Sequence, residues 1–109
     1  MDELIKQAES YVAASNDHDI ARIRMMLASD CSYRSAGVGA YDGLDAITTM
    51  MQSFFAANPD VHWQVEDYRW QSGHVVFDFV ITLDGTSSSG VEEIHFDKAG
   101  AICRIVVHR

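Results

Sequence analysis

Cysteine is scarce in this chain of 109 residues, which has only Cys31 and Cys103. The two form no Cys-x-x-Cys pair, so the thiol spacing of a redox motif or a zinc ribbon is missing. The N-terminal residues also lack the basic and then apolar layout of a secretory signal peptide. We therefore expect a cytoplasmic protein with reduced, structural thiols, in which Cys103 is a small core residue.

Basic residues are also few, because 8 Lys and Arg stand against 16 Asp and Glu, for a formal net charge of -8. That charge repels phosphate backbones and anionic lipid surfaces, so neither nucleic acid nor a membrane is an expected partner. No apolar run approaches the length of a membrane-spanning helix. The 48% hydrophobic and 22% charged residues are typical of a globular protein, and we predict one domain over residues 1–109.

Sequence motifs for metals and nucleotides are missing too. The five histidines show no His-Glu-x-x-His or other compact ligand spacing, so we predict no metal site. A cluster of histidines dispersed along the sequence would not be revealed by spacing, and nothing in the sequence favours one. Gly37-Val38-Gly39 lacks the third glycine and the strand-to-helix setting of a dinucleotide site, and we predict no cofactor.

Helical periodicity dominates the first half of the chain. Apolar stripes predict one helix around residues 4–12 and a second around residues 20–27, with Asp17 or Asp19 as the N-cap of the second. After an extended piece at residues 31–35, Asp42 is expected to cap a third helix. Pro59 cannot continue that helix.

After Pro59 the apolar period changes to two, which is typical of strands. Helices followed by antiparallel strands predict an α+β domain with the helices on one face of the sheet. If that sheet is strongly curved, its interior is cone-shaped and the mouth of the cone suits a small molecule. Trp70 has the opposite parity to Trp63, so we expect it to face outward and to be buried in a dimer.

The last hairpin places a carboxylate on an apolar face, because Glu92 shares its parity with Ile94 and Phe96. An ionised carboxylate is costly to bury alone. An inward Glu92 would therefore be a proton-transfer group with a raised pKa, or a partner for Arg109 or another cation at the pocket mouth. A bulge that shifts the strand by one residue would instead expose Glu92 and turn Glu93 inward.

Four short segments stand in a recognisable order: Leu27-Ala28-Ser29-Asp30, Tyr41-Asp42-Gly43-Leu44-Asp45-Ala46-Ile47, Asn58-Pro59-Asp60-Val61 and Phe96-Asp97-Lys98-Ala99-Gly100-Ala101-Ile102. In this order and spacing nearly the whole chain resembles the nuclear-transport-factor-2-like superfamily, and in particular its SnoaL-like branch. The relatives of that branch include polyketide cyclases and ketosteroid isomerases. The resemblance implies a cone-shaped, cystatin-like or ketosteroid isomerase-like α+β barrel with a hydrophobic pocket, dimerised through the outer face of the sheet.

The resemblance also implies two catalytic candidates. Ketosteroid isomerases carry a hydrogen-bonding tyrosine on the first helix, which corresponds to Tyr11, and an acid four residues before the aromatic of the final turn, which corresponds to Glu92. Their proton-shuttling aspartate falls near Ser35, whose hydroxyl is no general base without an activating neighbour. Tyr11 is equally well explained as a core residue whose hydroxyl lies at the edge of the core.

Two classes of function follow from these residues. The first is an apolar pocket for an oxygenated hydrophobic compound, with cofactor-free proton transfer of the isomerase, cyclase or hydratase type. The second is a non-catalytic module that forms a homodimer or docks to a larger protein through a partly apolar outer sheet face. The residues expected to line the pocket, each of which could equally be core, are Ser35, Met50, Met51, Phe54, Trp63, Phe77, Phe79, Ile94, Ile105, Val107 and Arg109.

Overall fold

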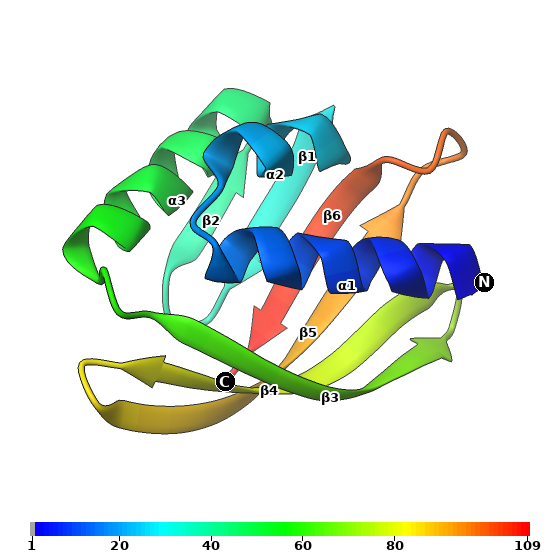
Figure 1. The fold of residues 1–109 in the computed structure, drawn as a ribbon. Coiled ribbons are helices and arrows are strands. Elements are labelled where there is room, and N and C mark those ends of the chain that lie inside the picture. The colour runs from blue at the N-terminus through cyan, green and yellow to red at the C-terminus, as the bar shows by residue number, and fades with distance from the viewer. Residues whose placement is uncertain (1) are drawn as a thin grey trace.

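The computed structural model describes residues 2–109 and has three helices and one six-stranded sheet (Figure 1). The elements in chain order are α1 (Asp2–Asn16), α2 (Ile20–Met26), β1 (Leu27–Ser35), β2 (Gly39–Asp42), α3 (Leu44–Ala57), β3 (His62–Gln71), β4 (His74–Leu83), β5 (Thr86–Phe96) and β6 (Ile102–His108). The α+β class predicted from the periodicity is confirmed. No helix within residues 2–109 is both long enough and apolar enough to cross a membrane.

The sheet has the strand order β2-β1-β6-β5-β4-β3 and is mixed. All neighbouring strands are antiparallel except β1 and β6, which run parallel. The prediction of a wholly antiparallel sheet is therefore corrected at this one pair. The reason is topological, because the β5–β6 hairpin brings the last strand back along β1 in the same direction.

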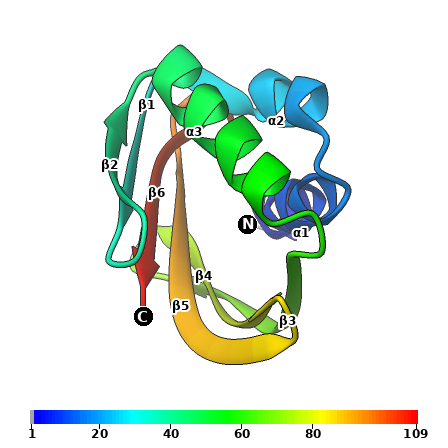
Figure 2. The ribbon, with the colours of Figure 1, turned by 90° about the vertical axis from the view of Figure 1, so that its left-hand side faces the viewer.

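Strong curvature of the sheet shapes the molecule. In Figure 2 the broad ribbon of β5 bends, so that β3 and β4 turn away from the plane of β1, β2 and β6. The three helices lie over the concave side, and the sheet stays open at its β2 and β3 edges. The core fills the space between helices and sheet, where Ile23, Ile47, Phe77, Ile94 and Ile105 are almost completely buried.

The helix boundaries follow the predicted caps in one case and differ in another. Asp19 caps α2 by accepting a hydrogen bond from the backbone N–H of Arg22 at 3.1 Å, as predicted. Asp42 does not cap α3, because Gly43 occupies the N-cap position and provides no side-chain bond. The Asp42 carboxylate instead pairs with the Arg34 guanidinium at 3.0 Å.

Two irregularities in the sheet overturn predictions that assumed unbroken alternation. The register of β3 shifts between Glu66 and Arg69, so Trp70 pairs with Val75 and packs against the core instead of facing outward. A second shift, in the β5–β6 ladder, leaves Cys103 half-buried, although it was expected in the core. Each shift moves one residue out of the pairing, and the side chains beyond it change face.

Candidate functional site

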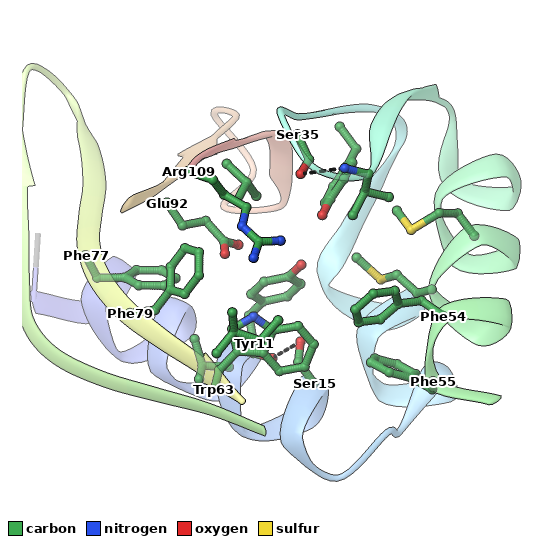
Figure 3. Close-up of a pocket in the computed structure, with 17 residues that line it drawn as sticks. Tyr11, Ser15, Ser35, Phe54, Phe55, Trp63, Phe77, Phe79, Glu92 and Arg109 are labelled. Carbon is green, nitrogen blue, oxygen red and sulfur yellow. Dashed lines mark hydrogen bonds between the residues drawn. The ribbon is translucent and has the colours of Figure 1, made fainter. Parts of the chain in front are cut away.

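A cavity lies between the concave face of the sheet and helices α1 and α3 (Figure 3). Of the residues predicted from the sequence, those on its wall are Tyr11, Ser35, Met50, Met51, Phe54, Trp63, Phe77, Phe79, Glu92, Val107 and Arg109. The remaining wall residues, which were not predicted, are Val12, Ser15, Tyr33, Val38, Phe55 and Ile81. The curved sheet thus gathers side chains from both halves of the chain around one space.

The free volume inside is small. The space is about 690 Å³ when its open mouth is included, but the centre of a water molecule can lie in only about 60 Å³ of it. That is room for ordered water or a small group, since one water needs roughly 10–15 Å³ by this measure. A larger ligand therefore requires movement at the entrance, where Met50 and Phe54 are half-buried and Arg109 is exposed.

Two predicted pocket residues do not line the cavity within the described part of the chain. Ile94 and Ile105 are fully buried and pair with each other across β5 and β6. Parity placed them on the correct face of the sheet. They lie further along the strands within the buried core cluster, so we assign them to the core.

Glu92 is the one carboxylate among the wall residues that the structure describes. It lies on β5 between Phe77 of β4 and Val107 of β6, and only 6% of its surface is exposed. Within residues 2–109 no Lys, Arg or His forms an ion pair with it. Burial alone raises the pKa of this carboxyl to about 8. The inward orientation predicted for Glu92 is confirmed, and the pairing with Arg109 is absent.

Two phenols share the interior with this acid. Tyr11 extends from α1 and Tyr33 from β1, and both are buried on the cavity wall. Burial, and then the charge of Glu92, raises the pKa of Tyr11 well above its usual range. The same two causes, in the same order, raise the pKa of Tyr33. Both phenols therefore keep their protons, and a protonated phenol is able to donate a hydrogen bond to an oxygen inside the cavity.

Tyr33 was not predicted, although the sequence carried a signal for it. In the extended piece at residues 31–35, Tyr33 shares its parity with Cys31, which is fully buried, and with Ser35, which lies on the wall. A strand that crosses the concave face must place all three on one side. The polar hydroxyl of Tyr33 is thus positioned by the same alternation that buries Cys31.

Ser35 and Arg109 have structural contacts of their own. The Ser35 hydroxyl oxygen accepts hydrogen bonds from the backbone N–H groups of Gly37 and Val38, at 3.3 and 3.2 Å. Among the described residues, no carboxylate or imidazole forms a hydrogen bond with this hydroxyl. The Arg109 Nη2 donates to the Ser88 hydroxyl at 2.7 Å, so this side chain is held at the cavity rim.

On the opposite, convex face of the sheet, ligand atoms of His74, Glu93 and His95 lie within 4.8 Å of one another. Spacing along the sequence predicted no metal site. The cluster was missed because its members come from two strands, and only the cross-strand register brings them together.

Comparison with known proteins agrees with this fold. No curated protein sequence matches the chain significantly. A protein from Kribbella flavida provisionally named a ketosteroid isomerase has 16% identity and a TM-score of 0.87, over 98% of this chain and 77% of that one. A SnoaL-like protein of unknown function from Burkholderia thailandensis has 16% identity and a TM-score of 0.86, over 99% and 96% of the two chains.

A third structure, from Sinorhizobium meliloti and provisionally named a polyketide cyclase, has 13% identity and a TM-score of 0.84, over 94% of each chain. At these identities the similarity shows the fold alone. The sequence of the chain, however, matches the SnoaL-like domain over residues 8–105. With that match over most of its length, the chain belongs to the SnoaL-like domain family of the nuclear-transport-factor-2-like superfamily.

Proposed function

We propose that this protein binds a small, mainly apolar molecule with one carbonyl or hydroxyl oxygen and catalyses a cofactor-free proton transfer on it, of the isomerase or cyclase type. The observation that carries the proposal is Glu92, a carboxyl that is buried in a mainly apolar cavity and has no cation partner among residues 2–109. Perturbed acids in clefts are frequent at catalytic sites. The names of the Kribbella flavida and Sinorhizobium meliloti structures belong to the same reaction classes.

In the proposed reaction Glu92, Tyr11 and Tyr33 have separate roles. Ionised Glu92 removes a proton from the carbon next to a substrate carbonyl, and a base with a pKa of about 8 is well matched to neutral pH. The electrons of the broken C–H bond move to the carbonyl oxygen as the enolate forms. Tyr11 and Tyr33 donate hydrogen bonds to that oxygen, and Glu92 then returns the proton to carbon. Because Glu92 is the sole carboxylate among the described residues of the wall, it performs both transfers.

Exchange of a carbon-bound proton tests the base directly. The test compound is 2-tetralone, a bicyclic ketone with acidic α-protons. We expect the protein to accelerate the exchange of these protons for deuterium in D₂O, and proton NMR measures the rate. Glu92→Gln should reduce the rate by at least about 100-fold, which is the usual contribution of a general base. The rate should rise as the pH passes through about 8, because the base is the ionised form. Exchange by Glu92→Gln at the rate of the wild type would exclude this role.

Binding of a phenol tests the cavity independently of turnover. The fluorescent probe 2-naphthol places a hydroxyl oxygen where an enolate oxygen would lie, so we expect saturable binding that Tyr11→Phe weakens about 10-fold by loss of one hydrogen bond. Tyr41→Phe is the matched control, because Tyr41 lies on β2 and is not among the wall residues. Equal affinity in the Tyr11→Phe and Tyr41→Phe variants would remove Tyr11 from the site.

The second candidate function, homodimerisation, has one specific observation in its favour. The convex face of the sheet carries Val80 on β4, which is 39% exposed, and the half-buried Val106 on β6. Apolar residues on an open sheet face are characteristic of dimer interfaces. Sedimentation equilibrium should give twice the chain mass, and Val80→Lys should give the single mass. A monomeric wild type at high concentration would reject this candidate.

A further inference from the structure

Three imidazoles surround a single carboxylate on the convex face of the sheet. The Glu93 Oε1 lies 3.0 Å from the Nε2 of His95 and 3.4 Å from the Nε2 of His74. The Glu93 Oε2 lies 2.6 Å from the Nε2 of His108. Strands β4, β5 and β6 each contribute to this cluster, so three adjacent strands fix its members.

The side chains converge because of the sheet geometry. Glu93 and His95 are two residues apart on β5 and therefore point to the same face. Val76 pairs with Glu93 on one side and Val106 pairs with it on the other, which places His74 and His108 two positions away along the neighbouring strands. The rings of His74 and His95 are stacked, with centroids 4.1 Å apart. The cluster is thus built on rigid elements and not on a loop.

The donor set matches one class of metal ion. Two imidazole nitrogens and a carboxylate oxygen are ligands that Zn²⁺ takes in open sites, with bonds of about 2.0–2.2 Å. At a tetrahedral angle such bonds hold the ligand atoms about 3.3–3.5 Å apart. The 3.0 and 3.4 Å separations from Glu93 are close to this spacing, and the three ligand atoms lie within 4.8 Å of one another.

Charge also favours a cation here. The formal net charge of the chain is -8, which attracts cations at long range. Arg104 on β6 pairs with His95 on β5, and its positive charge opposes the binding of a cation. Its side chain is exposed.

We propose that His74, Glu93 and His95 form a Zn²⁺ site on the convex face, with His108 orienting the carboxylate. The Nε2 of His74, the Nε2 of His95 and the Oε1 of Glu93 are the three protein ligands. His108 holds the other carboxylate oxygen, as second-sphere partners of metal ligands do. The fourth position of a tetrahedral ion is open to water or to a ligand from another molecule.

Isothermal titration of tag-free protein with ZnCl₂ tests this site. We expect saturable binding of one Zn²⁺ per chain that excess Mg²⁺ does not compete with, because Mg²⁺ prefers an all-oxygen octahedral shell. Glu93→Gln and His95→Asn should each weaken binding by more than 10-fold, and His108→Asn by about 10-fold, the range found for outer-shell partners. His62→Asn on β3 and Cys103→Ser are the matched controls and should bind as the wild type does.

A second measurement locates the ion. In NMR spectra of the histidine rings, Zn²⁺ should shift the resonances of His74 and His95 and leave those of His18 and His62 in place. Far-UV circular dichroism of each variant in EDTA checks that the fold is retained. Absence of saturable Zn²⁺ binding by the wild type, or unchanged binding by the His74→Asn/His95→Asn double variant, would overturn the site. Because the cluster faces away from the cavity, neither result bears on the role proposed for Glu92.

Discussion

Glu92→Gln is expected to raise the free energy of unfolding by about 4 kcal/mol above pH 8, while it removes the proposed activity. The reason is that an acid with a pKa of about 8 in the folded protein and 4.5 in the unfolded chain must be ionised while buried at high pH. Glutamine keeps the size of the side chain but carries no charge. A substitution often raises stability and lowers activity together when the catalytic group that it removes destabilises the folded state.

The sign of the pH dependence is fixed by which state binds more protons. Between pH 4.5 and about 8 the folded protein holds a proton on Glu92 that the unfolded chain has lost, so wild-type stability falls as the pH rises through this window. Below pH 4.5 both states are protonated and the wild type and Glu92→Gln should differ little. Urea unfolding followed by tryptophan fluorescence at pH 4, 6 and 9 measures the difference.

A matched substitution isolates this effect. Glu66→Gln removes an exposed carboxylate from β3, and its stability should follow that of the wild type at every pH. A constant difference between Glu92→Gln and the wild type from pH 4 to pH 9 would mean that Glu92 titrates as a solvated acid. The proposed proton transfer would then lose its physical basis.

Gly90→Ala is expected to destabilise the fold by about 2–3 kcal/mol, because β5 has no room for a side chain at this point. A Cβ atom at Gly90 would overlap the ring of Phe79 at Cζ and lie 2.6 Å from the backbone oxygen of His108. The ring could rotate, but the backbone of β6 cannot yield without loss of the sheet pairing. Thermal and urea unfolding of the variant measure the loss.

Two further variants separate overlap with the ring from overlap with the backbone. Ser89→Ala, next along β5 and exposed, should lie within about 0.5 kcal/mol of the wild type. Gly90→Ala combined with Phe79→Leu should recover only part of the loss, since the contact with His108 remains. Stability of Gly90→Ala equal to that of Ser89→Ala would contradict close packing of Phe79 over β5.

Alternation along single strands predicted much of the cavity. Strand alternation predicted that Glu92 points inward from β5. Helical spacing predicted that Met50, Met51 and Phe54 lie on the face of α3 that meets the sheet. These are local patterns, in which one residue fixes the direction of the next. The resemblance to SnoaL-like proteins supplied the fold and the relation of Tyr11 to Glu92, which no local pattern contains.

Features set by pairing between distant strands were not predictable in this way. Trp70 was assigned to the wrong face because the bulge near Asp67 has no clear sequence signature. The grouping of Glu93 with His74 and His108 depends on the register of three strands, which alternation within one strand does not determine. Whether Ile94 lines a cavity or fills the core depends on how far the helices stand from the sheet, and that distance is a property of the whole fold.

The parallel pairing of β1 with β6 has a consequence for folding. The residues of β1 up to Ser35 meet those of β6 up to Val107 only after the long intervening chain has closed into a loop, which is slow compared with hairpin formation. The β3–β4 and β4–β5 hairpins need no such closure. We therefore expect β1 and β2 to join the sheet late, after β6 has paired with β5 and forms the edge of the β3–β4–β5–β6 sheet. Until then the cavity lacks the wall that Tyr33 and Ser35 provide, and Glu92 stays open to water.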